Sequence, residues 1–280
     1  MTWTKWESVK GTSYSEIIYE KKYRKEGGAV ARISLNRPQQ KNAITGRMRD
    51  ELITALDEAS VDESVGVVVL TGTGEHFCVG SDPAFSATAQ QMRGAMLYGP
   101  SPDLAIMQCR QPVIAAVKGH CLGTGNHLSY FADMTVAADT ATFQQIGPRW
   151  GSPVNGWQPA YLQRIIGTKK AREMWMCNRL YTAKQALEMG LVNSVVPFNK
   201  LEEETDAFCA DVLSGAPELE AILKVSMNSD FQGMVGVRGL YLKTMAPKWF
   251  ETPNYEEAVR VRMEGIQGNF FKGTGPSSDK

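Results

Sequence analysis

The chain has 280 residues, of which 43% are hydrophobic and 21% are charged, a composition typical of a globular protein rather than a disordered or fibrous one. Thirty Lys and Arg balance thirty Asp and Glu, so no basic surplus favours nucleic acid or an anionic membrane as the partner. Every apolar run falls short of the about 18 residues that span a bilayer, and the first residues lack the apolar core of a signal peptide. We therefore expect a cytoplasmic protein whose partner is a small molecule, with neither nucleic acid nor membrane.

The cysteines also fit a cytoplasmic protein. The five cysteines are an odd number, are widely scattered and contain no CxxC pair: Cys78, Cys109, Cys121, Cys177 and Cys209. This distribution argues against a disulfide framework and against a zinc site. We expect reduced thiols and no bound metal.

The first two hundred residues predict strands that alternate with helices. Residues 16–36 alternate in part between apolar and polar side chains and are interrupted at Gly27 and Gly28, which predicts a hairpin. Apolar side chains then recur at helical spacing, which predicts a helix over 45–59. Continuous apolar runs, typical of strands buried on both faces of a parallel sheet, follow at 65–70, 113–117 and 134–138.

This order predicts an α/β core over residues 1–200, with right-handed crossover connections. Helical periodicity dominates residues 201–272, where Met and aromatic side chains suit either a private core or, as we expect, an oligomer interface. The tail 273–280 is rich in Gly, Pro and Ser and is expected to be disordered.

Two glycine-containing loops, residues 77–82 and 119–127, follow predicted strands and lead toward helices. Such loops bring backbone N–H groups to the ligand-binding edge of an α/β sheet, where they could hold a phosphate or an oxyanion. Neither loop reads GxxxxGK[ST] or GxGxxG, so the nucleotide-binding fingerprints are absent.

Several ordered motifs span about residues 15–265. They comprise Asn-Arg-Pro at 36–38, Lys-Asn-Ala at 41–43, Val-Val-Leu-Thr-Gly at 68–72, Phe-Cys-Val-Gly-Ser-Asp at 77–82, Pro-Val-Ile-Ala-Ala-Val-Lys-Gly at 112–119 and Gly-Leu-Val-Asn at 190–193. Together they resemble the crotonase superfamily, also called the enoyl-CoA hydratase/isomerase family. A second set comprises 143–148, 156–157, 161–162 and 169–175. This set is similar to the 1,4-dihydroxy-2-naphthoyl-CoA synthase branch, which includes enzymes that hydrolyse ring C–C bonds of cyclic β-keto acyl-CoA thioesters.

The resemblance implies the crotonase α/β fold, a spiral of ββα units followed by a C-terminal helical trimerisation region, assembled as a homo-trimer or as a hexamer of two trimers. It also implies an acyl-CoA substrate. Coenzyme A would then arrive as the thioester of the substrate, and no tightly bound cofactor is expected.

In this family two backbone N–H groups bind the thioester oxygen and stabilise an enolate, and by motif position they belong to Ser81 and Thr124. A prepositioned donor of this kind is worth roughly 3 to 4 kcal/mol in related acyl chemistry. Thr124 stands where the family usually has glycine, so its β-branched side chain could restrict the loop or narrow the acyl pocket. Lys41 and Ala43 match the segment that lines the path of coenzyme A; the alternative for Lys41 is a solvated surface lysine.

The chain departs from the hydratases of the family at two positions. Those enzymes carry two glutamates that handle water, and the matching positions here hold His127 and Gly147. A straight-chain hydratase mechanism is therefore not expected. His127 is the strongest side-chain candidate for acid–base work, because an unperturbed imidazole titrates near neutrality. The competing interpretation is a histidine that hydrogen-bonds a loop carbonyl.

Some members of the naphthoate synthase branch bind bicarbonate through residues that match Gln145, Gly147 and Trp157, so bicarbonate is an alternative base. The branch also uses an aspartate and a tyrosine, which correspond here to Val154 and Trp249, and this weakens the assignment.

Three smaller expectations concern the surroundings of the site. Tyr98 and Arg93 fall in the segment that forms a lid over the acyl pocket in relatives, so Tyr98 is a candidate pocket residue. Asp82 is expected to cap or brace its turn, and His76 and His120 are expected to be surface residues or to brace loops.

The hypothesis that follows is an acyl-CoA lyase or hydratase that stabilises a thioester enolate on a bulky, cyclic acyl-CoA, by adding water or breaking a C–C bond. The alternatives are a 1,4-dihydroxy-2-naphthoyl-CoA synthase and a non-catalytic acyl-CoA binder.

Overall fold

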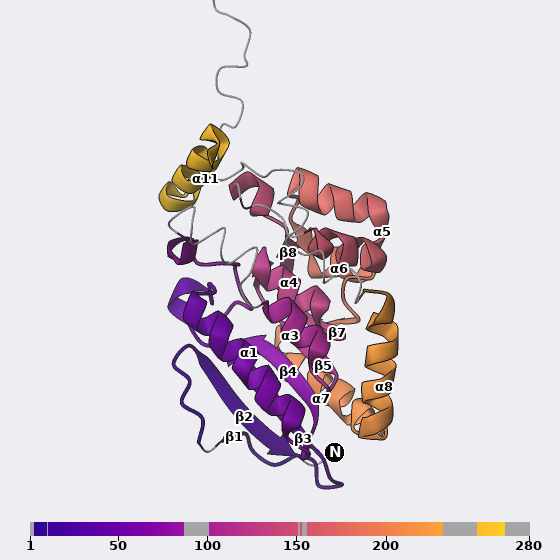
Figure 1. The fold of residues 1–280 in the computed structure, drawn as a ribbon. Helices are drawn as coiled ribbons and strands as arrows, with labels where there is room; N and C mark the ends of the chain where they lie inside the picture. Colours follow the sequence, from indigo (N-terminus) through magenta and orange to yellow (C-terminus); the bar gives the residue numbers. More distant parts are fainter. Residues whose placement is uncertain are drawn as a thin grey trace, which may run out of the picture.

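A seven-stranded sheet forms the centre of the molecule in the computed structural model, which describes residues 3–9, 11–86, 101–150, 152, 156–231 and 251–266 (Figure 1). In spatial order its strands are β1 (Glu7–Ser8), β2 (Ile17–Tyr23), β3 (Ala29–Leu35), β4 (Val65–Gly72), β5 (Val113–Val117), β7 (Met134–Ala138) and β10 (Ser194–Val196). The pairs β1–β2 and β2–β3 are antiparallel, and every neighbouring pair from β3 onward is parallel.

The opening hairpin is present as predicted. Ile17 pairs with Leu35 and Tyr23 pairs with Ala29, so β2 and β3 are aligned along their whole length. The turn between them contains Gly27 at φ 106° and Gly28 at φ 82°, a backbone conformation that side-chain-bearing residues rarely adopt.

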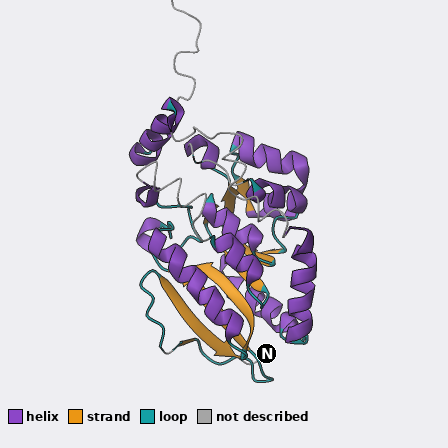
Figure 2. Cartoon of the chain, in the orientation of Figure 1, coloured by secondary structure: helices purple, strands orange, loops and turns teal. Residues whose placement is uncertain are grey.

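Both faces of the parallel strands are buried, as the continuous apolar runs predict. On one face, side chains such as Val68 and Leu70 pack against helices α1 (Gly46–Val61), α3 (Pro102–Gln108) and α4 (Thr124–Phe131). On the other face, Val67 and Val69 belong to a separate cluster that includes residues of α7 (Leu201–Val212). Figure 2 shows α1 lying across the front of the sheet.

The remaining helices follow the core. They are α5 (Trp157–Cys177), α6 (Ala183–Glu188), α8 (Pro217–Asn228) and α11 (Pro253–Glu264), with short 3-10 turns η1 (Pro38–Gln40), η2 (Pro83–Ser86), η3 (Gly147–Trp150), η4 (Phe198–Lys200) and η5 (Ser229–Phe231). Within the described residues beyond 201, the predicted helices are present at Leu201–Val212, Pro217–Asn228 and Pro253–Glu264. No helix within the described ranges is long and apolar enough to cross a bilayer.

A second, three-stranded sheet was not predicted. Its order is β6 (His120–Leu122), β8 (Thr142–Gln144) and β9 (Tyr181–Thr182), so part of the expected glycine loop is a short strand. This strand also touches the other glycine loop, because Cys78 N donates to the His120 carbonyl and Leu122 N donates to the Cys78 carbonyl, each at 2.9 Å. The two loops are therefore fixed to each other by main-chain hydrogen bonds.

Helix α8 is attached to the core by a buried lysine. Lys224 Nζ lies 2.7 Å from Asp133 Oδ2 and donates to the Ile106 and Gln111 carbonyls at 2.9 and 3.0 Å. Asp133 Oδ2 also accepts from Val113 N at 2.7 Å. One side chain thus joins α8 to the end of α3 and the start of β5.

We predict that Lys224→Met lowers the free energy of unfolding by about 2 to 3 kcal/mol, because it removes the cation beside a largely enclosed carboxylate. This loss is smaller than that expected for a fully buried ion pair, because the Asp133 side chain is 24% exposed. Urea denaturation would measure it. The matched control is Lys170→Met, which breaks the exposed Lys170–Glu173 pair and should cost less than about 1 kcal/mol. Equal losses in the two variants would contradict the prediction.

Candidate active site

The first glycine loop places Ser81 at an open edge. Ile44 N donates to the Gly80 carbonyl and Asp82 N donates to the Ile44 carbonyl, each at 2.8 Å, which forms a parallel bridge between Ile44 and Ser81. In such a bridge the intervening amide points away from the partner strand. The Ser81 amide accordingly donates to no other residue in the described part of the chain.

The second loop brings Thr124 to the same place. Thr124 is the first residue of α4, where a helix leaves its N–H groups without internal partners. A Cβ built on Gly80 would lie 3.5 Å from the Thr124 nitrogen, so the loops are in van der Waals contact. The side chains meet as well, with Ser81 Oγ and Thr124 Oγ1 2.8 Å apart.

The structure therefore brings together the two residues that the motifs single out. Both amide donors lack an acceptor in the described ranges and lie beside the positive end of α4. Such a pair suits an oxygen that gains negative charge during a reaction. Thioester enolisation, which the motifs imply, places negative charge on such an oxygen. The catalytic roles of Ser81 and Thr124 stay predictions.

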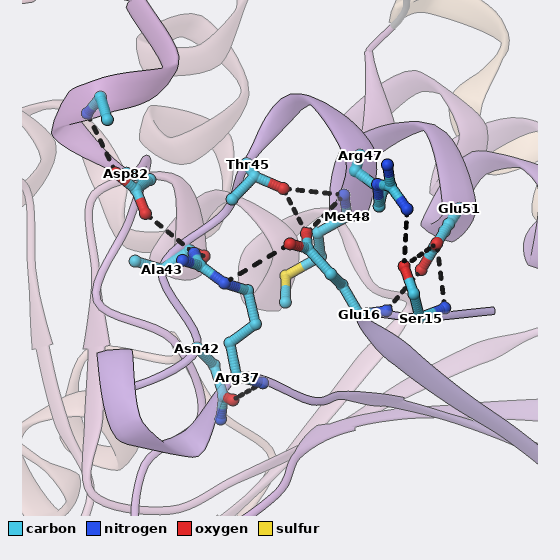
Figure 3. Close-up of polar contacts among 11 residues, drawn as sticks. Ser15, Glu16, Arg37, Asn42, Ala43, Thr45, Arg47, Met48, Glu51 and Asp82 are labelled. Carbon is cyan, nitrogen blue, oxygen red and sulfur yellow. Dashed lines mark hydrogen bonds and ion pairs between the residues drawn. The ribbon is translucent and has the colours of Figure 1, made fainter.

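Arg37 braces the turn that follows Ser81 (Figure 3). Its Nη1 donates to the Ala43 carbonyl at 2.7 Å and to Asp82 Oδ2 at 2.8 Å, and its Nε lies 3.6 Å from Glu16 Oε1. Asp82 Oδ1 accepts from Ala84 N at 3.0 Å, which confirms the expected bracing role of Asp82. The conformation at Ser81 is thus held through Glu16, just before β2, through the 37–43 segment and through its own turn.

Lys41 and Ala43 run beside the Ser81 loop. The Lys41 carbonyl accepts from Val79 N at 3.2 Å, and Ala43 is buried at the start of the bridge with Ser81. The Lys41 side chain is exposed, which suits both a contact with coenzyme A and a solvated lysine. Their role in binding coenzyme A stays a prediction.

His127 lies one turn into α4 and is buried. Its Nε2 is 3.2 Å from Gln145 Oε1, and its ring centroid lies 5.6 Å from the ring centroids of both Tyr130 and Trp175. Burial lowers the pKa of His127 to about 3, so the imidazole is neutral at physiological pH. An imidazole with this pKa is a weak base near pH 7, and its partner is a side-chain amide rather than the expected loop carbonyl.

A tryptophan that was not among the expected site residues lies beside Gly147. A Cβ built on Gly147 would lie 3.8 Å from Trp175, and Asn178 Nδ2 donates to the carbonyls of Gln145 and Trp175, each at 2.8 Å. The tryptophan beside Gly147 and His127 is therefore Trp175, which the sequence did not single out as a site residue. Its only signal was its place at the end of the 169–175 motif.

Trp157, the expected third member, lies in an aromatic cluster, and its Nε1 is a buried N–H group without an acceptor in the described part of the chain. Its expected role stays a prediction. Trp157 is fully buried, with its ring 4.7 Å from that of Phe131 and 6.4 Å from that of Phe231. Trp157 and Trp175 stand near opposite ends of α5. Tyr98, Arg93, Val154, Trp249 and the tail 273–280 lie outside the described residues.

His76 and His120 brace the two loops, as expected. Their rings stack with centroids 4.5 Å apart, and His120 N donates to His76 Nδ1 at 3.1 Å. Burial, above all, lowers the pKa of both histidines. Within the described ranges no cluster of three or more His, Cys, Asp or Glu could hold a metal, and the five cysteines form no disulfide.

The depressed pKa of His127 predicts acid sensitivity. In the unfolded chain the imidazole takes up a proton below its ordinary pKa of 6.5, whereas in the folded chain it does so only near 3. Stability is therefore lost as the pH falls below 6.5, and at about pH 4 His127 accounts for a loss on the order of 3 kcal/mol. Urea denaturation at several pH values should show a shallower acid slope for His127→Gln than for the wild type. Parallel slopes would contradict the prediction.

The fold and the paired amides define a class of protein, namely crotonase-fold enzymes that act on the carbonyl of an acyl-CoA thioester. Residues 25–271 match the enoyl-CoA hydratase/isomerase family, and the chain belongs to that family. The expectations of the crotonase α/β fold, of an enzyme and of a coenzyme A thioester as the substrate class are thereby confirmed.

Solved structures are similar in fold to this chain. An enoyl-CoA hydratase/isomerase from Xanthobacter autotrophicus Py2 is 27% identical, with 95% of this chain and 100% of that chain covered and a TM-score of 0.74. An enoyl-CoA hydratase from Mycobacterium avium subsp. paratuberculosis K-10 is 22% identical over 92% of this chain and 99% of that chain, with a TM-score of 0.76. A methylmalonyl-CoA decarboxylase in complex with 2-nitronate-propionyl-CoA is 22% identical over 92% and 98%, with a TM-score of 0.76. The last two show similarity of fold alone.

Proposed function

We propose that this enzyme is a lyase or hydratase that stabilises the enolate of a bulky, cyclic acyl-CoA thioester and adds water or breaks a C–C bond. The observation that carries the proposal is the meeting of Ser81 and Thr124, whose amides have no acceptor among the described residues. Donors placed before the reaction stabilise developing charge without reorganisation, and in many acyl-transfer enzymes they lower the barrier more than any other group does.

The surroundings favour a ring over a straight chain. The positions that match the two water-handling glutamates hold the neutral His127 and the side-chain-free Gly147. Next to them lie the aromatic rings of Trp175 and Tyr130. Aromatic rings beside positions that lack a carboxylate suit a flat, bulky acyl group.

Mass spectrometry in heavy-oxygen water tests the proposal on a panel of linear and cyclic enoyl-CoA and β-keto acyl-CoA thioesters. A gain of one water with the ring retained indicates a hydratase, and a gain of one water with a new carboxylate indicates a C–C hydrolase. Turnover of the linear members alone would contradict the cyclic preference. Tight binding of the whole panel without turnover would support a non-catalytic acyl-CoA binder.

A second candidate is 1,4-dihydroxy-2-naphthoyl-CoA synthase with bicarbonate as the base. Gln145 Nε2 and Trp175 Nε1 are buried N–H groups without an acceptor in the described part of the chain, and both side chains neighbour His127. Trp157 Nε1 is a third such N–H group. Orphaned donors suit an anion, so Gln145, together with Trp175 or Trp157, would hold bicarbonate, which when bound would supply a proton acceptor. Bicarbonate-dependent ring closure of o-succinylbenzoyl-CoA would support this candidate, and no product with bicarbonate present would exclude it.

We also propose that residues 201–272 form the oligomerisation region of a homo-trimer or hexamer. Helix α8 leaves five large apolar side chains at least half exposed on a single chain: Leu219, Ile222, Leu223, Val225 and Met227. Light scattering after size exclusion should give three or six chains for the wild type and fewer for Ile222→Glu/Leu223→Glu, with Glu218→Gln unchanged. A monomeric wild type would contradict the proposal.

A further inference from the structure

We propose that the hydroxyls of Ser81 and Thr124 act as a pair that supplies a third hydrogen bond to the thioester oxygen, in addition to the two backbone amides. This inference rests on the proposed function, since it assumes that the oxygen lies between these loops. It assigns to the side chains a role separate from that of the amides, and it makes the hydroxyls themselves catalytic groups.

The first observation is the position of the pair. Ser81 Oγ and Thr124 Oγ1 are 2.8 Å apart, although 43 residues separate them in the sequence. Each hydroxyl belongs to a residue whose own amide has no acceptor among the described residues. Because the hydroxyl oxygen of Ser or Thr is joined to Cα through Cβ alone, each hydroxyl lies close to its own amide nitrogen, and the contact between the hydroxyls places the pair beside both amides.

The second observation is the number of protons. Two hydroxyls carry two protons, and the hydrogen bond between them uses one. Neither Oγ of Ser81 nor Oγ1 of Thr124 hydrogen-bonds to any further residue in the described ranges. One O–H therefore has no acceptor among the described residues and can donate to a ligand, and Ser81 is exposed, so a ligand can reach the pair.

The third observation is that both hydroxyls are held before a substrate arrives. Ser81 lies between the Ile44 bridge and the turn that Arg37 braces through Asp82. Thr124 is fixed at the start of α4, and its β-branched side chain has few rotamers. A donor held in place in this way acts without the cost of reorientation when charge develops.

The electrostatics favour donation to an enolate rather than to a neutral carbonyl. A hydrogen bond strengthens when the acceptor is ionised, and the N-terminus of α4 adds a partial positive charge beside the pair. The hydroxyl that donates to its neighbour also polarises that neighbour's own O–H, which makes the pair a better donor than a single hydroxyl. The pair therefore acts most strongly in the transition state.

Acetoacetyl-CoA is a suitable probe, because its enolate absorbs in the near ultraviolet and can be observed without turnover. The enolate fraction of the protein-bound probe is measured at saturation and fixed pH for the wild type, Ser81→Ala, Thr124→Val, the double variant and Thr124→Ser. We expect the double variant to lower the ratio of enolate to neutral form about 10- to 100-fold, as for loss of one hydrogen bond to a charged group. The single variant that removes the donating hydroxyl should show most of this loss.

Thr124→Ser keeps the hydroxyl and loses only the methyl group, so it should restore the ratio to within about threefold of the wild type. Thermal unfolding of each variant checks that the loops remain folded. A double variant with the wild-type ratio would overturn the role of the hydroxyls and leave the proposed function standing. A wild type that does not raise the enolate fraction above that of the free probe would overturn both.

Discussion

Replacing Thr124 with proline is expected to lower kcat/KM by about 10²- to 10³-fold on the substrate that the thioester panel identifies. Thr124 is the first residue of α4, a position where proline is well accepted because its missing N–H has no partner within the helix. The substitution therefore removes one amide donor and leaves the helix in place. Steady-state kinetics measures the loss of kcat/KM, and thermal unfolding shows whether the helix remains folded.

Thr124→Ala is the matched control for this variant. It loses the same hydroxyl as the proline variant but keeps the backbone N–H, so the difference between the two variants isolates the amide. We expect Thr124→Pro to be much the slower enzyme at similar stability. A kcat/KM for Thr124→Pro within about threefold of that of Thr124→Ala would show that the amide is not a catalytic donor.

Replacing Gly125 with alanine is expected to lower the free energy of unfolding by about 3 kcal/mol and to disable the site. A Cβ at this position would lie 2.4 Å from the Cys78 carbonyl oxygen and 2.8 Å from Cys78 Cβ. The same carbonyl accepts from Leu122 N, so relief of the clash must separate the loops that carry Ser81 and Thr124. Urea denaturation gives the stability, and the enolate fraction of bound acetoacetyl-CoA gives the state of the site.

Gly147→Ala provides the comparison for stability. The nearest atoms to a Cβ on Gly147 lie at 3.8 Å, an ordinary van der Waals distance, so its cost should stay below about 1 kcal/mol. A loss of stability in Gly125→Ala no greater than that in Gly147→Ala would contradict the close contact between the loops.

The larger elements could be predicted because their signals are local. The alternation in β2 and β3, the apolar runs of β4, β5 and β7, and the helical spacing in α1 follow from neighbouring residues. Helix α1 begins one residue later than predicted, because the Thr45 side chain accepts from Met48 N and caps the helix. Strand β6 has three residues and depends on hydrogen bonds with Cys78, far away in the sequence, so its own residues gave no signal.

The tryptophan beside Gly147 could not be predicted for a similar reason. Gly167, at φ 76° and ψ 155°, interrupts α5 between Trp157 and Trp175. Helical periodicity assigns a face only while the helix continues, so the interruption separates the orientations of the two rings. Sequence spacing therefore could not indicate which tryptophan accompanies Gln145.

The chemistry of the site was only partly accessible from sequence. The motifs could indicate Ser81 and Thr124, because the family places its amide donors at those positions. The burial that lowers the pKa of His127, and the contact between the two hydroxyls, both arise from packing between distant segments. Neither property has a local sequence signature.

Infrared difference spectroscopy of isotope-labelled crotonyl-CoA bound to the protein tests the oxyanion site directly, because it reports the stretching frequency of the thioester carbonyl. Strong hydrogen bonds to the thioester oxygen weaken the C=O bond and lower its frequency. We expect a frequency below that in water for the saturated wild type, and a return toward the water value in Thr124→Pro. A wild-type frequency equal to that in water, or the same shift in both proteins, would contradict an oxyanion site formed by Ser81 and Thr124.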